Sequence, residues 1–213
     1  MKLRIRALPV MVLAALLLPL ATAQIPQLTP FSADMQVTST RANAHETDGK
    51  IYISHDHMRM DIQGGPRGQA IMITTFSTKT TEMLMPEHNM YMEFKDDGSQ
   101  TRRAAMMPSV KPFRNPNNPC ANEEGTTCKN MGVEEVNGRS CDHWQMTDKN
   151  GKVSNVWIDQ KLHFPIKTVS QDSSWQLTNI KEGQPEASLF EIPPGYQKMD
   201  MGGMMQGMRP PQQ

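Results

Sequence analysis

Apolar and polar residues alternate over several stretches of this chain, which is the pattern of strands with one buried face. The first stretch begins at Phe31, and a second lies around Ile51 and Ile53. After residues 55–57 the apolar phase shifts by one residue, so a hairpin turn or a bend is expected there to keep both sets on the core face. The apolar positions are Phe31, Ala33, Met35 and Val37, then Ile51 and Ile53, then Met58, Met60 and Ile62.

The clearest local signal is a pair of alternating segments, residues 80–85 and 90–94, on either side of the sequence Pro-Glu-His-Asn. A four-residue connection of this kind predicts a β-hairpin. In the resulting register Met85 faces Met90. One face of the hairpin then carries the opposed pairs Met83 with Met92 and Met85 with Met90, together with Phe94, while the other face carries Leu84 and Tyr91.

The periodicity disappears between about residues 98 and 127, where prolines and asparagines are frequent. This irregular excursion divides the chain into two β-rich halves. In the second half Asn137-Gly138 separates two alternating runs, which predicts a hairpin with Val133, Trp144 and Met146 on one face. Elsewhere, strands are expected at residues 71–76, 153–158, 168–169 and 174–180, and a helical turn with Leu189 and Phe190 within residues 185–192.

The first 23 residues have the features of an export signal. Basic residues at positions 2, 4 and 6 precede an apolar run at 8–18, and Ala21-Thr22-Ala23 favours cleavage after Ala23. About 190 residues remain, which suits one β-rich domain at residues 24–198. The Gly-, Met- and Pro-rich residues 199–213 are expected to form a disordered tail.

Charge and hydropathy narrow the possible partners and the location. Cleavage removes three basic residues, so 22 Lys and Arg become 19 against 22 Asp and Glu, a net charge of −3. This balance argues against nucleic acid as a partner. No second apolar run approaches the ~20 residues of a membrane helix. We therefore expect a periplasmic or secreted protein with no membrane span after signal cleavage.

No set of residues typical of catalysis is present, since neither G-x-S-x-G nor H-E-x-x-H occurs. The sequence therefore predicts neither an enzyme nor a cofactor. His55 and His57 would share a face of an extended strand and are weak candidates for a metal site, although a solvated turn explains the phase shift there more simply. Of the three cysteines, Cys120 and Cys128 bracket a short loop, which favours their disulfide over one between Cys128 and Cys141.

Methionine is unusually frequent, with 19 residues in the chain. Pairs at i and i+2 share a sheet face, and unbranched thioethers adapt to varied apolar guests. A concave sheet lined this way suits acyl chains, whereas an ordinary core of unusual composition is the alternative. These strand methionines are Met58, Met60, Met83, Met85, Met90 and Met92. A second group, Met199, Met201, Met204, Met205 and Met208, lies in the tail, where soft thioethers prefer Cu(I).

Several motifs together resemble a family of uncharacterised secreted bacterial proteins, a domain of unknown function related to the outer-membrane lipoprotein carrier (LolA-like) superfamily. The similarity covers about residues 31–196. The motifs are the strand at 31–37, Gly49-x-Ile51-x-Ile53, Met58-Arg59-Met60, Val136-Asn137-Gly138-Arg139, Trp157-Ile158-Asp159, Pro165-x-Lys167 and Pro185-x-x-Ser188-Leu189-Phe190-x-x-Pro193-x-Gly195-Tyr196.

The resemblance implies a mainly β fold, in which a strongly curved antiparallel sheet forms an incomplete barrel and binds lipid groups on its concave side. Few short helices are expected. Arg59 would then stand beside the methionine lining and could meet a lipid head group. We accordingly predict an exported protein that binds or carries a lipid or a lipidated chain. The alternative is an envelope protein that binds copper or silver through its Met-rich segments.

Overall fold

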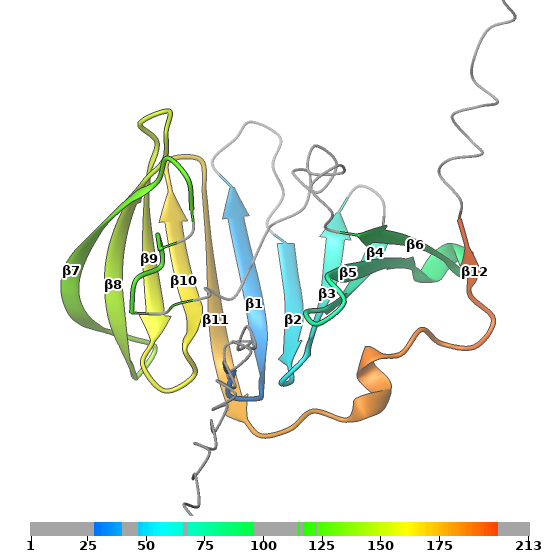
Figure 1. The fold of residues 1–213 in the computed structure, drawn as a ribbon. Helices are drawn as coiled ribbons and strands as arrows, with labels where there is room; N and C mark the ends of the chain where they lie inside the picture. Colours follow the sequence, from blue (N-terminus) through cyan, green and yellow to red (C-terminus); the bar gives the residue numbers. More distant parts are fainter. Residues whose placement is uncertain are drawn as a thin grey trace, which may run out of the picture.

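The computed structural model describes residues 28–39, 47–65, 68–95, 115, 117–121 and 123–199. The predicted signal, much of the excursion and the tail after Met199 lie outside these residues. Within them twelve strands form one sheet, in the order β12-β6-β5-β4-β3-β2-β1-β11-β10-β9-β8-β7. Neighbouring strands are antiparallel, except that β12 runs parallel to β6. Figure 1 shows an open, curved sheet, which confirms the predicted fold class.

Apart from β12, which lies beside β6, the two halves of the chain supply the two sides of the sheet, and they meet where β1 pairs with β11. The first half contains β1 (Phe31–Ser39), β2 (Thr47–Ile53), β3 (His57–Gly65), β4 (Gly68–Thr75), β5 (Thr80–Met85), the 3-10 turn η1 (Pro86–His88) and β6 (Met90–Lys95). The second half contains β7 (Thr127–Val136), β8 (Arg139–Thr147), β9 (Val153–Asp159), β10 (Phe164–Ser170), β11 (Ser173–Glu182), the 3-10 turn η2 (Ala187–Phe190) and β12 (Gln197–Lys198).

The phase shift in the sequence marks a tight hairpin turn between β2 and β3. Ser54 N–H donates to the carbonyl oxygen of His57 at 2.8 Å, and Ile53 then faces Met58 across the two strands. Both apolar sets therefore reach the same face. The hairpin of β5 and β6 also has the predicted register, because Met85 faces Met90.

The predicted strand at residues 168–169 is too short, because β10 begins at Phe164. Residues 164–166 are all apolar and include a proline, so no alternation indicates a strand there. In the structure the register with β9 shifts between Pro165 and Lys167. Phe164 and Ile166 are both fully buried at this irregularity.

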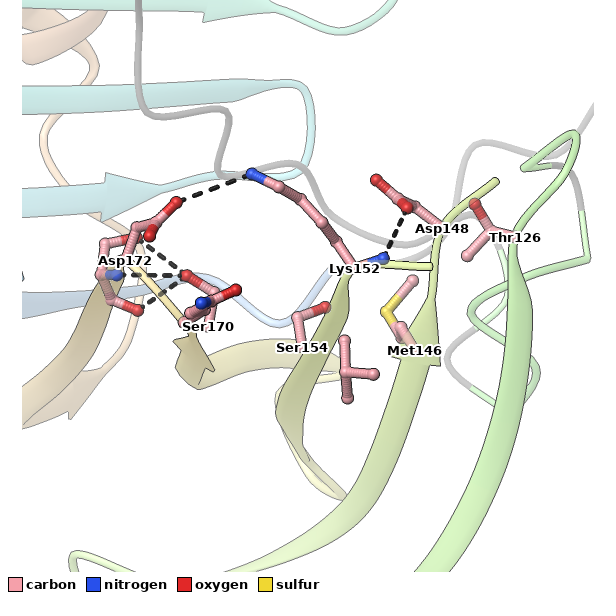
Figure 2. A pocket seen from close by; sticks show the side chains of 10 residues that line it. Thr126, Met146, Asp148, Lys152, Ser154, Ser170 and Asp172 are labelled. Carbon is pink, nitrogen blue, oxygen red and sulfur yellow. Dashed lines mark hydrogen bonds and ion pairs between the residues drawn. The ribbon is translucent and has the colours of Figure 1, made fainter. Parts of the chain in front are cut away.

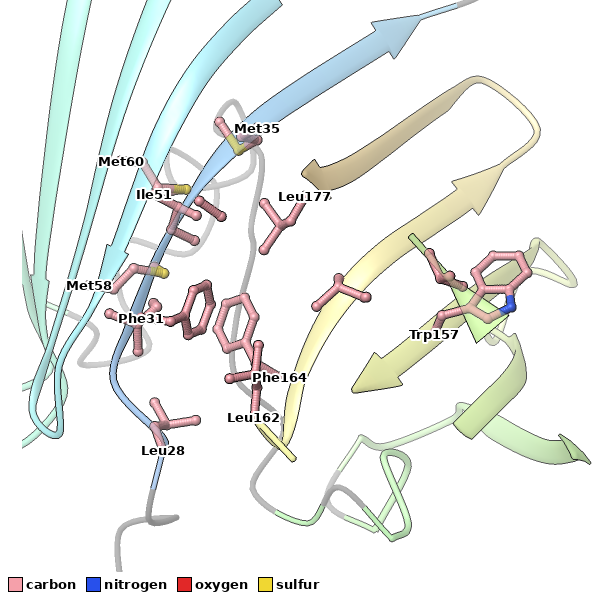
Figure 3. Packing of buried hydrophobic residues seen from close by; sticks show 14 of the residues in the cluster. Leu28, Phe31, Met35, Ile51, Met58, Met60, Trp157, Leu162, Phe164 and Leu177 are labelled. Carbon is pink, nitrogen blue, oxygen red and sulfur yellow. The ribbon is translucent and has the colours of Figure 1, made fainter. Parts of the chain in front are cut away.

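The main core lies on one face of the sheet, where the two halves meet (Figure 3). Phe31 and Met35 of β1 are 0% and 1% exposed. The ring of Phe31 meets that of Phe164 edge-on, with centroids 5.3 Å apart. Leu177 of β11 faces Met35 and joins the same core. The core therefore links the first strand to the last two long strands of the chain.

A second, smaller core covers the opposite face of β4 and β5. Ile71, Ile73 and Leu84 are buried there, and Phe190 and Tyr196 from the segment after β11 pack against them. β4 is thus buried on both faces. This explains why residues 71–73 form an apolar run rather than an alternating pattern.

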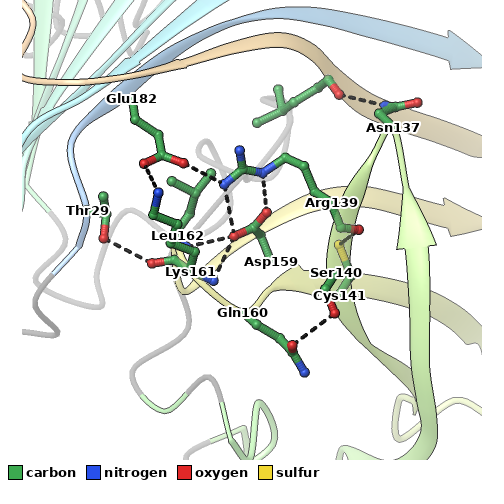
Figure 4. Close-up of polar contacts among 11 residues, drawn as sticks. Thr29, Asn137, Arg139, Ser140, Cys141, Asp159, Gln160, Lys161, Leu162 and Glu182 are labelled. Carbon is green, nitrogen blue, oxygen red and sulfur yellow. Dashed lines mark hydrogen bonds and ion pairs between the residues drawn. The ribbon is translucent and has the colours of Figure 1, made fainter.

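The Asn137-Gly138 hairpin is tied to the rest of the sheet through a buried carboxylate (Figure 4). Asp159 is 1% exposed, and Arg139 forms an ion pair with it. Oδ1 of Asp159 also accepts the backbone N–H groups of Lys161 and Leu162 at 2.8 and 2.7 Å. Arg139 donates in addition to Glu182 of β11 at 3.0 Å. The network joins β8, β11 and the turn after β9.

β7 carries a bulge beside this hairpin. Asn130 faces Trp144, but Gly132 faces His143, so one extra residue of β7 has no direct partner on β8. Gly132 has a φ of +108°, which a residue with a side chain adopts only with strain. The side chain of Asn130 accepts the N–H of Gly132 at 2.7 Å and stabilises the bulge.

Candidate functional site

Four methionines form a row across β3, β4, β5 and β6. Met60 faces Met72, Met72 faces Met83, and Met83 faces Met92. With about 4.8 Å between neighbouring strands, the three intervals span roughly 14 Å. The row is therefore a continuous stripe of thioethers on one face of the sheet.

The rows on either side of the stripe extend this surface. One contains Met58, Thr74, Thr81 and Phe94 in register. The hydroxyls of Thr74 and Thr81 lie 3.0 Å apart and hydrogen-bond to each other, so this polar pair is satisfied. We call the whole surface the Met face and define it as Met58, Met60, Met72, Met83, Met85, Met90, Met92 and Phe94.

Burial divides the Met face into two parts. Met58, Met60 and Met72 are 5%, 1% and 6% exposed and belong to the main core. The four methionines of the β5–β6 hairpin are partly exposed. The buried part is thus an ordinary core of unusual composition, whereas the hairpin part presents thioethers that a guest can contact.

Met72 was not predicted from the sequence as part of this surface. It lies in the apolar run 71–73, where the neighbours on both sides are also apolar and hide the alternation. Its place between Met60 and Met83 follows only from the pairing of β4 with β3 and β5.

Arg59 lies on the opposite face of β3. It faces Tyr52 on one side and Ile73 on the other, in a different register row from Met58 and Met60. Its guanidinium forms an ion pair with Asp61 at 2.6 Å and donates to the carbonyl oxygen of Leu189 at 2.8 Å. Arg59 therefore holds η2 against the face of the sheet opposite the Met face, which we call the outer face. We leave Arg59 out of the Met face.

Charged side chains also lie on this outer face. Glu82 faces Glu93 across β5 and β6, and Lys198 of β12 forms an ion pair with Glu93 at 2.8 Å. The hydrogen bond from Lys198 lowers the pKa of Glu93. Burial raises the pKa of Glu82, and the charge of Glu93 adds to this shift. Among the described residues, the register rows of the Met face contain no charged side chain.

The predicted metal candidates do not come together in the described residues. His55 is exposed, whereas the ring of His57 packs against Phe190 with centroids 5.4 Å apart. No group of three or more His, Cys, Asp or Glu side chains in this part of the chain is arranged to hold a metal ion. Met199 donates its N–H to Tyr91 at 2.8 Å, and the other tail methionines lie outside the described residues.

The cysteines pair as the sequence favours. Cys120 and Cys128 form a disulfide with their Cα atoms 5.8 Å apart. Cys141 faces Glu134, as the hairpin register predicts, and is a buried free thiol. Burial raises the pKa of Cys141 to about 12, so the reactive thiolate form is rare at neutral pH.

A family described as a domain of unknown function (DUF4412) matches residues 31–163, which is more than half of the chain. No relative matches among the curated proteins. In the part of the chain that the structure describes, no helix has the length and apolar character to cross a membrane.

Several solved structures share the fold. An uncharacterized conserved protein from Thermus thermophilus is 12% identical at a TM-score of 0.53, and the match covers 80% of this chain and 90% of that one. MucB, from the Pseudomonas aeruginosa MucA/MucB complex, is 10% identical at a TM-score of 0.51; the match covers 82% of this chain but 59% of the other. At 10% and 12% identity these two likenesses concern the fold alone. A LolA superfamily protein from Nitrosomonas europaea is 7% identical, over 79% and 92% of the two chains, but its TM-score of 0.38 is too low to show a shared fold.

Proposed function

The chain belongs to the DUF4412 family, and we propose that it is an exported envelope protein that binds or carries an apolar ligand, either a lipid or a lipidated chain, on the Met face. In this proposal the protein is a binding protein rather than an enzyme. The signal at residues 1–23 delivers it to an oxidising compartment, which agrees with the disulfide between Cys120 and Cys128.

The observation that carries the proposal is the partial exposure of the opposed methionines in the β5–β6 hairpin. Met83 faces Met92 and Met85 faces Met90, and these pairs continue directly from the buried core. An acyl chain laid on them gains about 0.8 kcal/mol for each CH₂ group that leaves water. Flexible thioethers can follow chains of different shape. The surface therefore favours apolar ligands but does not select one particular acyl chain.

The first experiment is direct detection of a bound guest. The full chain is purified from its envelope fraction and measured by native mass spectrometry, and the organic extract is analysed for lipids. We expect one lipid or acyl chain per protein, or uptake of a fluorescent acyl probe by the delipidated protein. Protein that neither carries nor takes up an apolar molecule contradicts the proposal.

Substitutions then locate the binding surface. Replacing Met83 and Met92 together by Leu conserves volume and should change stability by less than about 1.5 kcal/mol, with the range of accepted acyl chains narrowed. Replacing both by Asp places two like charges opposite each other on the apolar surface, and we expect a loss of probe uptake of at least about tenfold. The matched control, Glu82→Gln with Glu93→Gln, alters the opposed pair on the other face and should leave uptake unchanged.

These variants keep the proposal open to refutation even if the double-Asp protein does not fold. In that case the pair Met83→Gln and Met92→Gln provides a milder polar change at the same positions. A folded Asp or Gln variant with unchanged acyl uptake would show that the ligand does not use the Met face.

A further inference from the structure

The β5–β6 hairpin carries thioethers at its accessible positions and a hydrocarbon side chain at its buried one. Met83, Met85, Met90 and Met92 are all partly exposed, whereas Leu84, on the outer face, is 0% exposed. An apolar wall does not require sulfur, because Leu conserves the volume of Met and its apolar character. The choice of Met at the accessible positions is therefore a feature that acyl binding alone leaves unexplained.

The four thioethers form two opposed pairs on one face of the hairpin. Met83 faces Met92, and Met85 faces Met90. Directly opposed residues have Cβ atoms about 4.5–5.5 Å apart, and the two pairs lie about 7 Å apart along the strands. Because methionine side chains are unbranched and flexible, sulfur atoms of both pairs can converge on one point between them.

The C-terminal strand brings a fifth thioether to the same place. Lys198 of β12 faces Tyr91, and its Nζ donates to Glu93 on the outer face at 2.8 Å. Side chains alternate along an extended chain, so the next residue, Met199, is directed toward the Met face beside Met92. Met199 is partly exposed, and its N–H donates to the carbonyl oxygen of Tyr91 at 2.8 Å.

The cavity in the second half of the chain offers a different set of donors. It has a volume of about 360 Å³ and includes residues of the β8–β9 and β10–β11 turns (Figure 2). Among the described residues that line it, Met146 is the single side chain with sulfur, and the others include the oxygen donors Ser154 and Asp148. Oxygen ligands favour hard cations, whereas thioethers favour soft ones such as Cu(I). A soft cation is therefore favoured by the hairpin and not by the cavity.

The cysteines of the described residues do not compete for such a cation. Cys120 and Cys128 are joined in a disulfide. Cys141 is a buried thiol, and burial raises its pKa to about 12, so its thiolate is rare at neutral pH. Thioethers do not form disulfides, so they remain soft donors in a compartment where cysteines pair.

We propose that the β5–β6 hairpin binds one soft monovalent cation, Cu(I), through the thioethers of its opposed methionine pairs, with Met199 beside them. Ag(I) has the same preference for soft ligands and serves as a redox-stable probe. The inference goes beyond the proposed function, because it depends on sulfur rather than on apolar surface. Replacing Met by Leu keeps the apolar surface and removes the donor, so one substitution separates the two ligand classes.

Titration with metal ions tests the site in the full chain. Ag(I) binding is measured by calorimetry in chloride-free buffer, its stoichiometry by native mass spectrometry, and Cu(I) binding by anaerobic competition with a chromogenic chelator. We expect one Ag(I) or Cu(I) per chain at the hairpin. Zn²⁺ should bind at least about tenfold more weakly than Ag(I), because thioethers are poor ligands for a harder cation.

Substitutions locate the bound cation. Met83→Leu with Met92→Leu removes one opposed pair and should weaken Ag(I) binding at least about tenfold, while acyl probe uptake persists. The matched control, Met131→Leu with Met146→Leu, removes two thioethers that lie outside the hairpin and should leave Ag(I) affinity unchanged. A second control replaces the tail methionines by Leu and should also leave it unchanged. These are Met201, Met204, Met205 and Met208.

The outcomes separate this inference from the proposed function. Unchanged Ag(I) affinity in the folded Met83 and Met92 variant overturns the metal site, as does a loss of affinity in the tail variant alone or equal binding of Zn²⁺. If that variant does not fold, Met85→Leu with Met90→Leu removes the other pair and gives the same test. Absence of acyl uptake by the unmodified protein contradicts the proposed function and leaves the metal site standing.

Discussion

The buried ion pair of Arg139 and Asp159 gives a sharp prediction about stability. In Arg139→Met the carboxylate keeps its two backbone N–H donors but loses its cation while remaining 1% exposed. Removing one partner of a buried pair usually costs about 3–5 kcal/mol. Because two hydrogen bonds to Asp159 remain, we expect a loss near the lower end, about 3 kcal/mol. This is a large fraction of a typical stability of about 5–15 kcal/mol.

The reverse substitution should be milder. Asp159→Asn keeps an oxygen that can accept both backbone N–H groups, and the Arg139 left behind still donates to Glu182 at 3.0 Å. The side chain of Arg139 is also 21% exposed, so water can reach it. We expect a loss of about 1–2 kcal/mol. In the double variant no isolated buried charge remains, so its loss should be smaller than the sum of the two single losses.

Urea unfolding followed by tryptophan fluorescence and by circular dichroism measures these losses, with coincident transitions as the check for two-state behaviour. The charge-reducing control Lys161→Gln removes only the exposed partner of Glu182 and should change stability by less than about 1 kcal/mol. The reasoning fails if Arg139→Met lowers the free energy of unfolding by less than Asp159→Asn does. It also fails if the loss in the double variant equals the sum of the two single losses.

Further predictions concern single side chains. Arg59→Met should lower stability by about 2 kcal/mol in urea unfolding, because η2 loses the hydrogen bond from Arg59, and it should leave acyl probe affinity unchanged. Weaker probe binding would show that Arg59 takes part in ligand binding. Glu82→Gln should raise the melting temperature near pH 7, where ionisation of a partly buried carboxyl with a raised pKa opposes folding, and the gain should disappear near pH 4. A gain that persists in acid contradicts this. Cys141 should resist alkylation in the native protein at about pH 8 and react after unfolding, as mass spectrometry would show. Trp144→Phe should cost less stability than Trp157→Phe, since the buried indole N–H of Trp144 has no partner among the described residues, whereas that of Trp157 donates to a carboxylate.

Features with a local physical cause could be predicted from the sequence. Asn137-Gly138 specifies a tight turn by its own backbone preference, and Asn137 indeed has a φ of +52°. The opposed pair Met83 and Met92 follows from alternation on both sides of a short connection. The Cys120–Cys128 disulfide follows from the short loop between them.

Features that depend on distant segments could not be predicted. The residues around Arg59 do not indicate that it hydrogen-bonds to Leu189 of η2, which lies 130 residues further along the chain. The pairing of Arg139 with Asp159 requires the order of β8 and β9 and the turn after them. Met72 is hidden because β4 is covered on both faces.

The two edges of an open sheet differ in what they offer to other molecules. At one edge β12 pairs with β6 through Gln197 and Lys198 and so occupies backbone groups that another strand would otherwise use. At the other edge β7 has a bulge next to Gly132 and carries the charged residues Lys129, Glu134 and Glu135. Bulges and charges on an edge strand oppose the addition of a further strand. Both edges of this open sheet therefore oppose growth into a fibre, which leaves the sheet free to stay open as the proposed function requires.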